Sequence, residues 1–189
     1  CDLGRRYKIT KIAFKGHKLF SEEELRAMMK EAREGLDYSE NTVGRDAARI
    51  REKYGERAYI LAEVAPTHVI DREKPEVGIL YTIQENQEVS VGRIVIQGNT
   101  KTRTDVILPE LKDFTPGEKF NNKLLSKGIA RHRDRGYFDA QGGILYRTES
   151  GGAPNERDVV IDVKEGPTGN NRFAGGFSSS FGILGILEF

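Results

Sequence analysis

Large apolar and small side chains alternate along the last part of the chain, residues 165–189. The only charged residues after Pro167 are Arg172 and Glu188. This alternation is typical of a β-strand between two unlike media, and it fits a strand of a membrane β-barrel. A flexible Gly- and Ser-rich linker is the alternative, and aromatic side chains on a single parity count against it. We therefore predict a barrel strand with Phe173, Gly175 and Phe177 on one side.

The first 166 residues contain one pattern twice. Residues 12–17, IAFKGH, align with residues 94–99, IVIQGN, so that Gly16 matches Gly98. The matches continue in the same order through Gly35 on Gly117 to Glu85 on Glu165. We interpret this as a tandem duplication. The predicted domains are residues 1–86 and 87–166, followed by a third segment at 167–189.

Each copy predicts the order strand, helix, helix, strand, strand. In the first copy a strand ends in a turn at Gly16, and Ser21-x-x-Glu24 forms a capping box before the first helix. Ser39 is expected to cap a second helix that Gly55 stops. Two strands follow at residues 59–65 and 77–85, joined by a loop that contains Pro66 and Pro75. The helical faces are expected to bury Leu25, Met28, Met29, Ala32, Val43, Ala47, Ile50 and Tyr54.

The second copy repeats this order. A strand at residues 91–97 turns at Gly98, and a helix is capped near Thr102. Pro109 lacks a backbone donor and should shorten or kink that helix. The next helix is predicted at residues 121–136, with Leu125, Ile129 and His132 inward and Gly136 at its end. Strands are predicted at residues 137–146 and 158–165.

This order has a geometric consequence for the sheets. A helix pair between the first two strands makes the third strand parallel to the first and antiparallel to the second. The second strand is then left at a sheet edge, where free N–H and C=O groups can accept an extended peptide. An edge that is only solvated or covered by its neighbour is the alternative. The predicted contact residues are Ile60, Leu61, Ala62, Glu63, Val64, Phe138, Asp139, Ala140 and Gln141.

Composition and charge narrow the class of protein. The 189 residues are 37% hydrophobic and 31% charged, as in an ordinary globular protein. A net charge of +1 gives no basic field that would recruit nucleic acid. Cys1 is the single cysteine, so no disulfide can form within the chain. A terminal cysteine can carry a lipid, but we interpret Cys1 as the boundary of a fragment.

The sequence offers little for catalysis. His17, His68 and His132 lack the paired spacing of metal ligands, so we expect neither a metal nor a cofactor. We predict a turn role for His17, a packing role for His132 and a loop position for His68. The three glutamates at 22–24 fit a helix start better than an acid–base pair. The sequence therefore predicts no enzyme.

The chain resembles a known family. The βααββ order, the Gly-His and Gly-Asn turns and residues 135–140, RGYFDA, resemble polypeptide-transport-associated (POTRA) domains. Residues 163–169, VKEGPTG, resemble the junction with the barrel in BamA-type assembly proteins of the outer-membrane surface antigen superfamily. The resemblance implies an α+β fold of two tandem βααββ POTRA domains, with a three-stranded mixed sheet under two helices in each. It also implies a truncated first barrel strand.

The resemblance also implies a function. This region would lie in the periplasm at the outer membrane, receive unfolded outer-membrane proteins and dock accessory assembly lipoproteins. The missing barrel would hold it in the membrane. Two-partner secretion transporters, which also carry two POTRA domains, are the main alternative, and a cell-division POTRA is a more distant one. Two departures stand out: Ala58-Tyr59 where the family usually has Gly-Tyr, and Leu108-Pro109 early in a helix.

Overall fold

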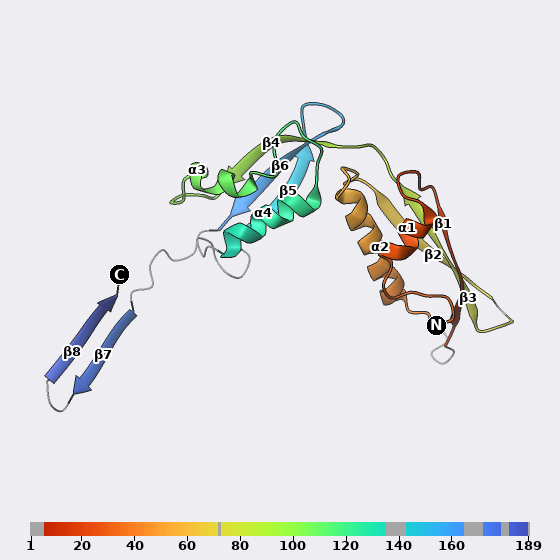
Figure 1. Ribbon diagram of the computed structural model, residues 1–189, viewed down its shortest axis with the longest axis horizontal. Coiled ribbons are helices and arrows are strands. Elements are labelled where there is room, and N and C mark those ends of the chain that lie inside the picture. The colour runs from red at the N-terminus through yellow and green to blue at the C-terminus, as the bar shows by residue number, and fades with distance from the viewer. Residues whose placement is uncertain (1–5, 72, 135–142, 165–171, 179–181, 189) are drawn as a thin grey trace.

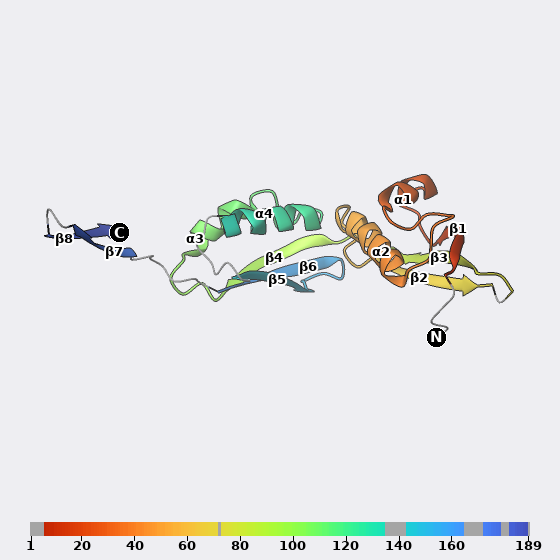
Figure 2. The ribbon, with the colours of Figure 1, turned by 90° about the horizontal axis from the view of Figure 1, so that it is seen from below.

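Two α+β units followed by a hairpin make up the part of the chain that the structure describes (Figure 1). The computed structural model describes residues 6–71, 73–134, 143–164, 172–178 and 182–188. Each unit has a three-stranded mixed sheet, with strand orders β1-β3-β2 and β4-β6-β5. Helices α1, α2 and α4 lie on the same side of the two sheets (Figure 2). The predicted α+β class and the predicted central position of each third strand are therefore confirmed.

Unit one comprises β1 (Lys8–Lys15), α1 (Glu22–Met28), α2 (Glu40–Gly55), β2 (Glu63–Ile70) and β3 (Glu76–Gln84). β3 runs parallel to β1, where Ile12 pairs with Ile79, and antiparallel to β2, where Thr67 pairs with Leu80. Alternate residues of β3 are buried under the helices, as expected for a sheet with one covered face. They join a core from both helices that includes Leu25, Met29, Ile50, Tyr54 and Tyr81.

Unit two comprises β4 (Ser90–Gln97), α3 (Thr104–Ile107), the 3₁₀-helix η1 (Leu108–Leu111), α4 (Asn122–Asp134), β5 (Ile144–Ser150) and β6 (Glu156–Val163). Pro109 has the predicted effect, because the α-helix ends at Ile107 and continues as a 3₁₀-helix. The second core includes Ile107, Phe114, Phe120, Leu125 and Ile161.

The start of α1 follows the predicted capping box. Ser21 Oγ accepts from Glu24 N at 3.2 Å, and Glu24 Oε2 accepts from Ser21 N at 2.8 Å. The helix is shorter than expected and ends at Met28. Asp46 explains the early end of the helix. Its carboxylate accepts hydrogen bonds from the backbone N–H groups of residues 30–32, which therefore do not continue the helical hydrogen bonding. Met29 and Ala32 are nevertheless buried, as predicted.

Helix α2 matches its prediction in extent and in its buried face, which consists of Val43, Ala47, Ile50 and Tyr54. Ser39 occupies the N-cap position, but its side chain makes no capping hydrogen bond. Its carbonyl instead accepts from Thr42 Oγ1 at 2.8 Å and from Val43 N at 3.1 Å. The predicted side-chain cap at Ser39 is therefore wrong.

The second strand of unit one lies later in the chain than predicted. β2 begins at Glu63 and includes Pro66 and His68, so the predicted loop positions of these two residues are wrong. Residues 59–62 form a turn instead, in which Ala62 N donates to Tyr59 O at 3.1 Å. Ala58 enters this turn with a φ of 71°, which reverses the chain after α2. In unit two the second strand, β5, begins at Ile144 within the described residues. Residues 137–142 of its predicted range lie outside the described residues.

The turn at residues 59–62 belongs to the joint between the units. Ile60 and Leu61 are partly buried against the core of unit two. Val89 N donates to Ala58 O, and Asn121 Nδ2 donates to Glu56 O, both at 2.9 Å. Residues 59–62 thus contact unit two instead of pairing with β3, and β2 begins directly after them.

The C-terminal hairpin consists of β7 (Arg172–Ser178) and β8 (Gly182–Glu188). The two strands are antiparallel, with Gly175 opposite Gly185. A strand is therefore present where the alternation predicts one, and its membership of a barrel stays a prediction. None of the described helices is long and apolar enough to cross a membrane.

Candidate binding edges

β2 is the first of two candidate binding edges. In an antiparallel ladder, successive residues point their N–H and C=O groups alternately toward and away from the neighbouring strand. Asp71 N donates to Glu76 O at 2.9 Å, so the backbone N–H and C=O groups of odd-numbered residues in β2 point toward β3. The backbone groups of the even-numbered residues therefore point outward, at Val64, Pro66, His68 and Ile70. Pro66 fits this alternation because it has no N–H group to lose from the ladder.

β5 is the second edge, and its register is fixed in the same way. Lys164 N donates to Gly143 O at 2.6 Å, and Gly151 N donates to Glu156 O at 3.0 Å. The backbone groups of odd-numbered residues thus point toward β6. Those of the even-numbered residues point outward, at Ile144, Tyr146, Thr148 and Ser150. Within the described ranges, no strand lies beyond β2 or β5.

Both edges carry exposed apolar side chains. Val69 is 71% exposed and Ile70 45% exposed at the end of β2, and Leu145 is 63% exposed on β5. His68 is held in place by Tyr38, whose hydroxyl lies 3.3 Å from His68 Nδ1. Large exposed apolar groups on a free edge favour pairing with another chain, because a partner strand buries both backbone and side chains.

A groove runs beside β5 where the two units meet. It has a volume of about 330 Å³ and is formed by α2, the turn before β2, the start of α4 and β5. Ile60 and Tyr146 contribute apolar surface, and Arg51, Glu52 and Lys123 contribute charge. The backbone groups of Tyr146 face outward and the residue lines this groove, so a strand added at β5 would lie beside the groove.

The structure separates the predicted contact residues. Glu63 and Val64 lie in β2, whereas Ile60, Leu61 and Ala62 precede it, and Ala62 is 2% exposed. Phe138, Asp139, Ala140 and Gln141 lie outside the described residues, as does Gly136. Sequence reasoning missed the later part of the two edges, which consists of residues 66–70 and 147–150. Pro66 was the available signal, since proline is tolerated in a strand where its nitrogen faces away from the neighbour.

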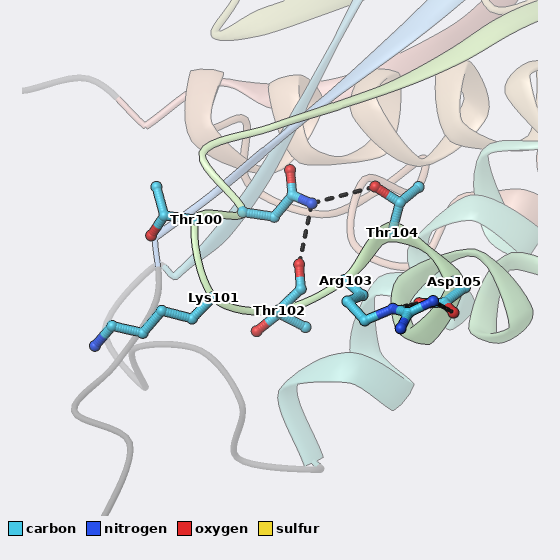
Figure 3. Close-up of a pocket in the computed structure, with 7 residues that line it drawn as sticks. Thr100, Lys101, Thr102, Arg103, Thr104 and Asp105 are labelled. Atoms are coloured by element: carbon cyan, nitrogen blue, oxygen red, sulfur yellow. Dashed lines mark hydrogen bonds and ion pairs between the residues drawn. The ribbon is translucent and has the colours of Figure 1, made fainter.

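A second hollow, of about 490 Å³, lies in the loop after β4 (Figure 3). Asn99 Nδ2 donates to Thr102 O at 3.0 Å and to Thr104 Oγ1 at 3.2 Å. Arg103 and Asp105 form an ion pair at 2.8 Å. These side chains hold the turn in place, so the arrangement serves the loop itself.

The histidines are all held by local contacts. His17 Nδ1 donates to Phe20 O at 2.9 Å, in keeping with a turn role. His132 is 1% exposed and its Nε2 donates to Ile107 O at 2.7 Å, so it is a buried packing residue. Across the described residues no three side chains of His, Cys, Asp or Glu gather as metal ligands would.

Glu85 fastens the end of β3. Its Oε1 accepts from Lys18 N at 2.6 Å, Leu19 N at 2.8 Å and the Tyr54 hydroxyl at 2.8 Å. Burial by itself raises the pKa of this carboxyl, but the three hydrogen bonds prevail and hold the pKa below its ordinary value. Burial also raises the pKa of Tyr54, and the bond to Glu85 adds to that shift. The last turn of α2 and the turn after β1 are thereby tied to the strand that leads into unit two.

Comparisons with known proteins agree with this architecture. The family model described as "POTRA: Surface antigen variable number repeat" matches residues 7–86 and 89–166. The chain is similar to the outer membrane protein assembly factor BamA of Nitratidesulfovibrio vulgaris, with 26% identity over 97% of the chain and 23% of that protein. It is 25% identical to BamA of Buchnera aphidicola over 98% of the chain and 30% of that protein. The chain thus spans less than a third of the length of these relatives.

Solved structures show the same fold. BamA POTRA3-5 of Haemophilus influenzae superposes with a TM-score of 0.76 at 22% identity, over 84% of this chain and 61% of that one. BamA of Haemophilus ducreyi lacking POTRA domains 1-3 gives a TM-score of 0.72 at 19% identity, over 94% of this chain and 32% of that one.

Proposed function

This chain belongs to the POTRA family of surface antigen variable number repeats, and from that premise we propose that it is the client-receiving region of an outer-membrane protein assembly factor. It lies in the periplasm, next to a barrel that begins with β7. Its clients are unfolded outer-membrane proteins, which add as strands to β2 and β5. The same surfaces and the joint dock accessory assembly lipoproteins.

One observation carries this proposal: two units present a second strand whose outward backbone groups have no partner within the described ranges. An edge strand binds the backbone of its partner, so it accepts many sequences with modest affinity. Unfolded barrel proteins share an extended, alternating pattern and little else in sequence. An acceptor for such clients needs the tolerance that a free edge gives.

The clients and the edges also match in their side chains. A barrel strand has apolar groups on one face only. Tyr146 of β5 lines the groove at the joint, where one apolar face of an added strand would be covered. The names of the similar proteins support the same role, since they are given as outer membrane protein assembly factors.

The test removes one outward donor from each edge. In the variants His68→Pro and Thr148→Pro, the side chain and the N–H group are both lost. The matched controls, His68→Ala and Thr148→Ala, lose the side chain and keep the N–H group. The probe is a synthetic peptide of about ten residues that alternates Phe and Thr, the length and pattern of a barrel strand.

Backbone amide shifts are recorded by NMR as the peptide is titrated into the chain. We expect shifts along β2 and β5 in the parent protein and in the alanine controls. Loss of one backbone hydrogen bond should weaken binding at the altered edge about fivefold in the proline variants. Equal affinities for the proline and alanine variants would show that neither edge receives the peptide.

A further inference from the structure

β1 and β4, the strands at the opposite edges of the two sheets, differ in a way that the repeat makes easy to see. In unit one the free side of β1 is closed by two charged side chains. Ile12 N donates to Glu34 Oε1 at 3.0 Å, and the Arg26 guanidinium donates to Ile12 O. Arg26 also lies 3.5 Å from Glu34 and stacks over the Phe14 ring, 5.7 Å from its centroid. These contacts show that the backbone groups of Ile12 point away from β3.

In unit two the described residues form no equivalent closure. Ile94 pairs with Val159 as Ile12 pairs with Ile79, so its N–H and C=O groups also point outward. By the same alignment Leu108 stands where Arg26 stands, and Pro116 stands where Glu34 stands. Neither side chain can form a hydrogen bond. Within the described ranges, no side chain bonds to the backbone of Ile94.

By the alignment with unit one, the positions around this free edge are apolar. We call the group Ile94, Ile96, Leu108, Pro109 and Pro116 the β4 rim. Ile94 and Ile96 are partly buried against the core of unit two. Leu108 is 41% exposed, and Pro109 and Pro116 are exposed as well. The equivalent positions in unit one line a hollow with the side chains of Arg26 and Glu34. A partly exposed apolar rim beside free backbone groups is the kind of edge that proteins otherwise protect with charge.

The free stretch is short and well defined. Val91, nearer the start of β4, is already occupied, because its N–H donates to Glu118 O and its carbonyl accepts from Gly117 N, both at 2.8 Å. A bulge then separates Val91 from Ile94 in the pairing with β6. The outward groups that remain are those of Ile94 and Ile96, within residues 94–97.

We propose that residues 94–97 of β4 are an additional docking edge for an extended polypeptide segment with apolar side chains on the face that meets the β4 rim. Free N–H and C=O groups at strand spacing are matched by another extended backbone, which neither a helix nor a lipid provides. Leu108 and Pro116 replace an Arg–Glu pair, so the partner face is apolar rather than charged. The proposed function enters this inference only in naming the class of partner, an unfolded polypeptide; the free edge itself is argued from β4. Unit one has no such site on β1 at Ile12.

The test grafts the closure of unit one onto unit two. The double variant Leu108→Arg/Pro116→Glu supplies the two charged groups, and the same Phe–Thr peptide serves as the probe. We expect amide shifts at residues 94–97 in the parent chain and at least a fivefold loss of affinity at this edge in the double variant. Ile96→Pro, which deletes an outward donor and shortens a rim side chain, should have the same effect. Ile96→Ala, which shortens the side chain and keeps the donor, should lose less affinity than Ile96→Pro.

The reciprocal variant, Arg26→Leu/Glu34→Pro, opens β1 and should create new shifts around Ile12. If the amide shifts of residues 94–97 stay unchanged while those of β2 and β5 change, this inference is overturned and the proposed function stands. Silence at all three edges would overturn both. Shifts at residues 94–97 that grow with protein concentration in the absence of peptide would show a second copy on this edge, and would overturn the assignment to a partner segment.

Discussion

At the residue scale, Gly16 and Gly98 do equivalent work at the ends of β1 and β4. Their φ angles are 88° and 84°, in the left-handed region that glycine adopts without strain. A Cβ atom on either would lie 2.2 Å from a carbonyl oxygen, that of Ile83 for Gly16 and that of Val163 for Gly98. The turn therefore needs glycine for two separate reasons, conformation and close approach to the central strand.

Gly35 allows these two reasons to be separated. It has the same φ of 88°, but a Cβ atom there meets nothing within 4 Å. Gly35→Ala should cost about 1–2 kcal/mol of the free energy of unfolding, from backbone strain alone. Gly16→Ala should cost clearly more, since the Ile83 carbonyl or the turn has to move. Urea denaturation of both variants measures the difference, and equal costs would contradict the close-approach argument.

At the scale of elements, a charged network joins the segment after α1 to α2. Glu31 accepts from Arg45 Nε at 2.8 Å and from Arg49 at 2.6 Å. Asp46, fully buried, accepts from Lys30 N at 2.8 Å, Ala32 N at 2.7 Å and Arg49 at 2.6 Å. The network replaces the last turn of α1 with side-chain hydrogen bonds.

The network predicts how stability depends on pH. Hydrogen bonds from Arg45 and then Arg49 lower the pKa of Glu31 from 4.5 to about 2. A lowered pKa in the folded state stabilises the protein above pH 4.5, and this contribution is lost as pH falls toward 2. The pKa of Asp46 is lowered as well, because its hydrogen bonds outweigh the opposing effect of burial.

We therefore expect the thermal unfolding midpoint to fall between about pH 5 and pH 2. Glu31→Gln should make the fall shallower, since this side chain no longer titrates. Glu52→Gln, an exposed change on α2, is the control and should leave the profile as it is. Parallel profiles for the parent chain and Glu31→Gln would contradict a role for Glu31.

The same scale shows what local sequence signals can and cannot predict. Ser21 and Glu24, the apolar face of α2 and the break at Pro109 depend on neighbours within a few residues, and each was predicted. The strand order followed from the βααββ sequence alone, because it is a matter of chain direction.

The start of β2 could not be predicted in this way. Ile60 and Leu61 have the composition of a strand, but they pack against a core whose residues lie in the next unit. That contact is tertiary and overrides local preference. The candidate edges were consequently predicted in the right position of the sheet but too early in the chain. In unit one the predicted strand at residues 59–65 shares only residues 63–65 with β2.

At the scale of the whole molecule, the units are coupled through a joint that uses few residues. The linker Asn86-Gln87-Glu88 is short, and Asn86 Nδ2 donates to Leu61 O at 2.6 Å. Gln87 Nε2 donates to Pro154 O at 2.7 Å in the loop between β5 and β6. The edges β2 and β5 thus have a defined relation to each other, with the groove at the joint beside one of them.

This arrangement predicts that Ile60 and Leu61 hold the units together. Ile60→Ala/Leu61→Ala removes half-buried apolar groups from the second core and should lower the stability of unit two by about 1–3 kcal/mol. It should also give the units independent tumbling, because small interfaces permit relative motion by default. NMR relaxation of each unit reports the tumbling. Leu145→Ala, at a side chain that is 63% exposed, is the control. Unchanged tumbling together with unchanged stability would mean that the backbone and Asn121 contacts hold the joint without these side chains, so the two edges would keep their relation even when the apolar contact is lost.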